Sequence, residues 1–220
     1  MASRTMHLAI AKEIEGHNPI NNIYRYEIGQ ILPDAITHSL SNHADSHFKS
    51  TVCDGRMKMI DFAKFRSDFQ DEIATDDLYL GYYFHLIQDG IYRRFLYYDY
   101  GYKVTCPEDV ELLHNDYHLL NTYLVSKYHL QNSFSKPEGF EKEKINHVYP
   151  FSFDAYLEDL KNDFLPYRSG KTVFFTESMA DEYISSCSEL CNREFESVQS
   201  ERTCVNPMDF AWKLPIKIND

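Results

Sequence analysis

The chain has 220 residues, which suits one domain with a buried core, and its net charge of −12 comes without a stripe of Lys and Arg. A protein that binds duplex nucleic acid would carry such a basic stripe, so this class of function is not expected. The 17 Tyr and 15 Phe residues suit either an aromatic core or a half-buried aromatic cavity.

Apolar residues recur mostly at helical spacing, and strand-like alternation is almost absent, so we expect an all-α fold. The first helix is predicted to begin after Thr5 and to end at Glu15. The second covers residues 23–30 and is ended by Pro33, because the residue before proline avoids the helical region. Residues 35–55 are rich in Ser, Asn, Asp and His and are predicted to be irregular.

The later part of the chain continues this pattern. Further helices are predicted over residues 57–69, 77–96, 107–124, 153–164 and 177–198. Residues 131–150 are expected to form a surface connection, and the tail after residue 205 is expected to be irregular. We therefore expect a single helical domain over residues 1–220, with the site in residues 1–130 and supporting helices and the tail in residues 131–220.

The cellular context follows from cysteine usage and hydropathy. The five cysteines form no CxxC pair, and the sequence shows neither a signal peptide nor an apolar run of 18 residues. We expect reduced thiols in a cytoplasmic protein that has no transmembrane segment. The oligomeric state is left open.

The stretch GYYFHLIQDG, residues 81–90, contains a histidine and an aspartate four positions apart. In a helix, His85 and Asp89 project from the same face about 5–6 Å apart and can share one cation. A buried histidine that is hydrogen-bonded to an aspartate for structural reasons is the alternative. The pair alone does not decide between them.

Three other residues bear on this choice. His7 lies in the first predicted helix near its apolar stripe, Asp34 follows Pro33 at a helix end, and His47 lies in the polar stretch NHADSHF. Each is also compatible with an ordinary surface, turn or loop position.

Their order along the chain resembles the zinc-dependent phospholipase C family, whose all-helical fold is shared with fungal single-strand-specific nucleases. The resemblance lies within residues 1–130 and is carried by GQILPD, SHF, GYYFHLIQD and DYHLLN. It implies that Asp34, His47, His85 and Asp89 bind one metal ion. It further implies that His7 helps to hold a second ion, with Asp89 bridging the two.

The resemblance therefore implies a metal-dependent hydrolase of a small phosphate ester, such as a phosphodiester, that uses a metal-activated water. Asp34 could orient or deprotonate that water. Imidazole with carboxylate suits zinc, and also iron or manganese. Tyr82 and Tyr83 are expected either to wall the substrate cavity or to lie in the core.

The chain departs from the family in two respects. No signal indicates processing to a free N-terminal amine, which the secreted enzymes use as a ligand, and the later histidine and His-x-x-x-Glu pair for a third metal are missing. The HNDYH stretch (His114, Asp116 and His118) supplies weaker candidates, although exposed positions explain the two histidines equally well. We expect one or two metal ions.

Two alternatives remain open. One is a non-catalytic metal-binding protein that keeps the fold. The other is an HD-type nucleotide phosphohydrolase, which normally needs adjacent His and Asp residues, and the chain has no such pair.

Overall fold

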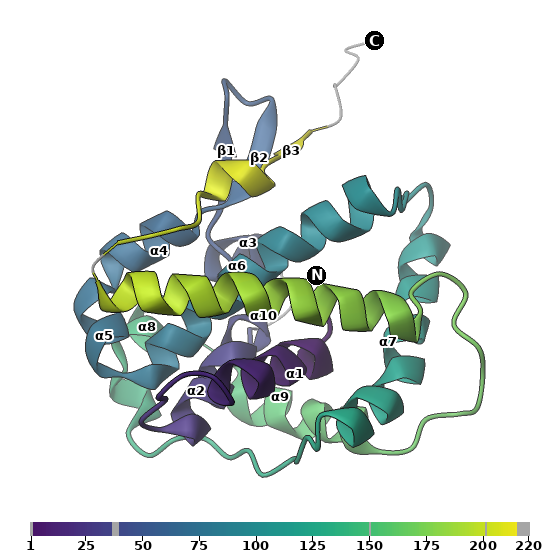
Figure 1. Ribbon diagram of the computed structural model, residues 1–220, viewed down its shortest axis with the longest axis horizontal. Helices are drawn as coiled ribbons and strands as arrows, with labels where there is room; N and C mark the ends of the chain where they lie inside the picture. Colours follow the sequence, from purple (N-terminus) through teal and green to yellow (C-terminus); the bar gives the residue numbers. More distant parts are fainter. Residues whose placement is uncertain (1, 37–39, 150, 201, 215–220) are drawn as a thin grey trace.

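The computed structural model describes residues 2–36, 40–149, 151–200 and 202–214 (Figure 1). The protein is mainly helical with one small antiparallel sheet, which confirms the helical prediction in its coarse form. The longer helices are α1 (Arg4–Glu15), α2 (Ile23–Ile31), α6 (Asp77–Arg94), α7 (Pro107–Lys127), α9 (Phe153–Leu160) and α10 (Glu177–Gln199). The shorter ones are α3 (Leu40–Ser46), α4 (Phe62–Asp68), α5 (Gln70–Thr75) and α8 (Lys144–Val148). In the part of the chain that the structure describes, no helix is both long and apolar enough to cross a membrane.

Helix α6 is the centre of the fold. Every residue from Leu78 to Tyr92 is buried, because α1, α2, α4, α5 and α10 all pack around this helix. Asp76 caps its first turn by accepting a hydrogen bond from the backbone N–H of Leu78. A polar side chain in the middle of α6 is therefore enclosed by protein on all sides.

Helices α2 and α6 approach each other unusually closely at two glycines. A Cβ atom on Gly29 would lie 2.1 Å from the carbonyl oxygen of Leu78, and one on Gly81 would lie 2.2 Å from that of Tyr26. Neither position has room for a side chain. The contact brings the C-terminal end of α2 against the middle of α6, where His85 lies.

Helix α2 continues into a short 3₁₀ helix, η1 (Leu32–Asp34), with Pro33 inside it. The second helix thus ends close to its predicted end, and the turn that follows carries Asp34 inward.

Residues 35–55 were predicted to be irregular, and this is wrong for the described part of the segment, which contains α3 and a strand. Residues 37–39 lie outside the described residues. Strand β1 (Lys49–Val52) pairs with β2 (Met57–Ile60), in register from Lys49 opposite Ile60 to Val52 opposite Met57. The turn between them uses positive φ angles at Cys53, Asp54 and Gly55. Asp54-Gly55 is a strong sequence signal for a hairpin turn, which the prediction overlooked.

Other boundaries also differ from the prediction. The helix expected over residues 57–69 begins as strand β2 and becomes α4 only at Phe62. The connection 131–150 contains η3 (Phe140–Lys142) and α8, which bury Phe140 and Ile145 in the core. The tail forms η5 (Pro207–Phe210) and β3 (Trp212–Lys213), which adds to the edge of β2. The smaller helix η4 (Lys161–Phe164) completes the predicted helix 153–164.

Candidate metal centre

The structure brings the five predicted metal-binding residues together beside the middle of α6. They are His7 on α1, Asp34 at the end of η1, His47 directly after α3, and His85 and Asp89 on α6. All are fully buried except Asp34, whose side chain is 18% exposed. Segments separated by up to 82 residues thus meet at one point.

Four side-chain atoms converge on one position, which we call the primary site. The His47 Nε2 atom lies 3.2 Å from His85 Nε2 and 3.3 Å from Asp34 Oδ1. Asp89 Oδ2 lies 3.6 Å from both Nε2 atoms. In a tetrahedral zinc site with metal–nitrogen bonds of about 2.0–2.1 Å, neighbouring ligand atoms are about 3.3–3.4 Å apart. The distances of His47 Nε2 from His85 Nε2 and from Asp34 Oδ1 match such a site, and those from the two histidines to Asp89 Oδ2 are slightly longer.

The outer nitrogens of the same histidines are fixed by hydrogen-bond acceptors. His85 Nδ1 donates to the backbone oxygen of Gln30 at 2.7 Å, and His47 Nδ1 donates to that of His43 at 3.0 Å. A neutral imidazole with its proton on Nδ1 has a lone pair on Nε2. The two Nε2 atoms therefore face each other across the primary site, an arrangement that a bound cation, or a proton held on His85, would satisfy.

A second group of atoms, the secondary site, lies on the other side of Asp89. Its second carboxylate oxygen, Oδ1, lies 3.5 Å from His7 Nε2 and accepts a hydrogen bond from the backbone nitrogen of Ala2 at 3.2 Å. The His7 ring stacks on that of His85 with centroids 4.0 Å apart. Asp89 therefore faces both sites, as a bridging carboxylate would.

Among the residues that the structure describes, two atoms at these sites have no hydrogen-bond partner, namely His7 Nε2 and Asp89 Oδ2. Leaving a buried polar atom unpaired costs about 1–3 kcal/mol, and more for a charged one. Both unpaired atoms point into the ligand group, so bound cations would satisfy them. The residues thus fit one or two metal ions.

The pKa shifts of the buried carboxylates agree with a metal-binding role. Burial alone would raise the pKa values of Asp34 and Asp89, but the histidines lower both below the ordinary carboxyl range, through His47 at Asp34 and through His7 and His85 at Asp89. Burial also lowers the pKa of His47. Burial would also lower the pKa of His85, but Asp89 and Asp34 raise it above the ordinary histidine value. The two buried carboxylates thus attract positive charge, which a proton on His85 or a divalent cation would supply.

A polar chain behind the histidines connects the two sites. His7 Nδ1 donates to Gln88 Oε1 at 2.6 Å, and Gln88 Nε2 donates to Gln30 Oε1 at 2.9 Å. Tyr183 donates to the backbone oxygen of Gln88. These contacts fix the ring orientation of His7, as outer partners do for metal-binding histidines. The two glutamines were not among the predicted site residues, because a glutamine inside a helix carries no distinctive signal.

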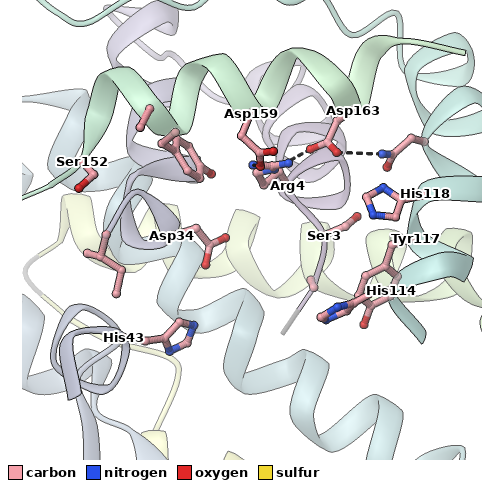
Figure 2. Close-up of a pocket in the computed structure, with 15 residues that line it drawn as sticks. Ser3, Arg4, Asp34, His43, His114, Tyr117, His118, Ser152, Asp159 and Asp163 are labelled. Atoms are coloured by element: carbon pink, nitrogen blue, oxygen red, sulfur yellow. Dashed lines mark hydrogen bonds and ion pairs between the residues drawn. The ribbon is translucent and has the colours of Figure 1, made fainter. Parts of the chain in front are cut away.

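A cavity of about 740 Å³ opens beside the primary site (Figure 2). Asp34 and His43 face it from one side, and His114, Tyr117 and His118 on α7 face it from the other. The predicted candidates His114 and His118 thus lie at the cavity wall. Among the described residues, neither belongs to a group of side chains close enough together to hold a metal ion.

Helix α9 and η4 close the cavity next to Arg4. The Arg4 guanidinium donates to Asp159 at 2.7 Å and to Asp163 at 2.6 Å, and it lies over the ring of Tyr156. The C-terminal helices, for which the sequence suggested no specific role, thus form a wall of this cavity.

Two predictions about the surroundings of the site are not borne out by the contacts. Asp116 does not reach either site, because its carboxylate accepts backbone N–H groups of the loop Val173–Phe175 at 2.7–2.8 Å. Tyr82 and Tyr83 do not line the cavity either. Their hydroxyls donate to the backbone oxygen of Ser46 and to Glu194, in the core on other faces of α6.

One residue at the site was missed by the sequence analysis. His43 lies one turn before His47, and their rings stack with centroids 4.1 Å apart. Burial, together with the neighbouring His47 and Lys49, lowers the pKa of His43 to about 3, so the ring is neutral at physiological pH. The His43/His47 spacing was visible in the sequence, but the surrounding Ser, Asn and Asp argued against a helix there.

Comparisons with family models, with curated proteins and with solved structures gave no match for this chain.

Proposed function

We propose that the protein is a metal-dependent hydrolase that cleaves a phosphate ester, most naturally a phosphodiester. The observation that carries the proposal is the pair of Nε2 atoms of His47 and His85, 3.2 Å apart and flanked by two ionised carboxylates. Buried carboxylates of this kind are either paired with a positive charge or coordinate a metal ion, and the imidazole nitrogens beside them are suitable metal donors. The order of these residues is also the order that resembles the zinc-dependent phospholipase C family, and we propose kinship with that family.

The proposed ligands divide between the two sites. Asp34, His47, His85 and one oxygen of Asp89 would hold the first ion, and His7 with the other oxygen of Asp89 would contribute to a second. Two or three imidazoles with carboxylates favour zinc, while iron and manganese accept the same donors. Divalent ions bound there would acidify water and offset the negative charge that builds up at phosphorus.

The side chains around the cavity could position the attacking water and the substrate. Asp34 is partly exposed and lines the cavity, so a water molecule there can hydrogen-bond to its carboxylate, which would orient the water and accept its proton. The volume of about 740 Å³ lies within the range of about 300–1,000 Å³ that is usual for small-molecule sites. The α7 histidines face the same space and can contact the rest of the ester.

The first test measures metal content and hydrolysis together. Protein purified without a chelator is expected to contain one or two equivalents of divalent metal per chain, measured by elemental mass spectrometry. It should hydrolyse bis(p-nitrophenyl) phosphate, lose this activity on chelation and regain it with added zinc or manganese. Wild-type protein that neither contains nor takes up metal would contradict the proposal. Bound metal without hydrolysis of any ester would favour the non-catalytic alternative.

A second prediction concerns the outer partner of His7. Gln88→Leu should remove the acceptor that fixes the His7 ring and should weaken binding of the second ion by about 10–100-fold. The first ion should be much less affected, because the outer nitrogens of His47 and His85 bond to backbone oxygens. Competition titration with a chromophoric chelator measures both affinities. Gln70→Leu, at an exposed position on α5, is the control; equal affinities in the two variants would rule out the role of Gln88.

A further inference from the structure

His43 lies close to the primary site, and Asp34, His43 and His47 are near enough to one another to form a possible metal-binding group. One of its ring nitrogens lies within 4.8 Å of ligand atoms of both Asp34 and His47, and its ring lines the cavity. Figure 2 shows the His43 ring and the Asp34 carboxylate directed into the same space. Its side chain is therefore placed next to the position where a bound ester would meet the primary site.

The proton position on His43 follows from its neighbour Lys49. The Lys49 Nζ atom on β1 lies 3.0 Å from His43 Nδ1. A lysine ammonium group has three donors and no acceptor, so Nδ1 must accept this hydrogen bond. With Nδ1 as the acceptor, the ring proton lies on Nε2, which makes Nε2 a hydrogen-bond donor.

This tautomer is the opposite of the one adopted at the primary site. His47 and His85 carry their protons on Nδ1 and present a lone pair through Nε2, as metal ligands must. His43 presents an N–H through Nε2, while its Nδ1 faces an ammonium group. In this tautomer the ring offers a hydrogen-bond donor to an anion, while its one lone pair is engaged by Lys49.

We propose that His43 is a substrate-binding residue whose Nε2–H donates a hydrogen bond to a non-bridging phosphoryl oxygen, and that Lys49 positions it by fixing this tautomer. This inference rests on the proposed phosphoesterase function. Negative charge on the phosphoryl oxygens makes an N–H donor effective, and a donor held in place by a neighbour needs no reorganisation during the reaction. No proton is transferred in this role.

The test compares two replacements of His43 in the full-length, metal-loaded protein. His43→Phe keeps a flat ring to stack on His47 but has no N–H, and His43→Gln keeps an N–H donor. Removing one such donor typically lowers kcat by about 10²–10³-fold, so this loss is expected in H43F. H43Q should keep at least about a tenth of the wild-type kcat/KM, since it preserves the hydrogen bond. Lys49→Met should lower kcat/KM by about 10-fold, as loss of an outer positioning partner does.

Metal content and inorganic phosphate binding separate the possible explanations. All three variants should hold as much metal as the wild type, and H43F should bind inorganic phosphate more weakly than H43Q. Loss of metal in H43F would make His43 a ligand and overturn the inference, as would a wild-type kcat/KM in H43F or equal losses in H43F and H43Q. None of these results contradicts the proposed function. A wild-type protein that neither binds metal nor hydrolyses an ester would instead contradict the proposed function itself.

Discussion

Asp89→Asn is expected to remove bound metal from the protein and to abolish hydrolysis. The carboxylate of Asp89 faces both sites, with Oδ2 3.6 Å from His47 and His85 and Oδ1 3.5 Å from His7. An amide in its place presents a single neutral oxygen and an NH₂ group, which cannot bind a cation. The variant should therefore lose both ions, while the packing around this position changes little because Asn and Asp have the same shape.

The thermal stabilities of the wild type and of D89N test the loss of bound metal independently. A ligand present at 100 times its Kd stabilises the folded state by about 2.7 kcal/mol. For a chain of this length, that corresponds to an increase in Tm of about 5–10 °C. Thermal unfolding with and without a chelator should show this difference in the wild type, and D89N should show none.

Asp116→Asn is the matched control. Asp116 is also a buried aspartate, but its carboxylate holds the backbone N–H groups of Val173 to Phe175 and lies outside both sites. D116N should lower the stability of the metal-free protein, because an NH₂ group would face N–H donors. Its metal content should match that of the wild type. Metal retained in D89N, or lost only in D116N, would contradict the assignment of the ligands.

The five candidate ligands could be named from the sequence because their order along the chain resembles a known family, and two local signals added to this. The spacing of His85 and Asp89 places both on one helix face, and Pro33 places Asp34 at a helix end. Nothing local, however, indicates which face of α6 meets the site. This helix is buried on all sides, so the apolar pattern of GYYFHLIQDG does not separate its faces. For this reason the sequence left Tyr82 and Tyr83 open between the cavity wall and the core.

The parts that escaped prediction depend on tertiary contacts. Helix α3 forms in a sequence of low helix propensity, and its end is held by a hydrogen bond from Ser46 Oγ to the backbone oxygen of Pro33. This bond joins α3 to the turn that carries Asp34, and it places His43 beside the site. The contact of His43 with Lys49 on β1 depends in turn on a hairpin that the prediction did not include.

The close contact of α2 and α6 leads to the second large expected effect. Gly81→Ala should lower the free energy of unfolding of the metal-free protein by about 3 kcal/mol, at the upper end of the cost of overpacking. The new Cβ would lie 2.2 Å from the carbonyl oxygen of Tyr26 and 3.0 Å from the backbone nitrogen of Gln30. Backbone atoms cannot rotate away as a side chain can, so the two helices must separate.

Gly90→Ala provides a control on the same helix. A Cβ there would lie 3.5 Å from the nearest atom of Phe210, an ordinary contact, and Ala stabilises a helix interior by up to about 1 kcal/mol relative to Gly. The two substitutions make the same chemical change but should shift the urea midpoint in opposite directions. Separation of α2 from α6 would also draw the backbone oxygen of Gln30 away from His85 Nδ1, so G81A should bind metal more weakly. Equal midpoints for G81A and G90A would show that the helices do not pack as closely as the structure indicates.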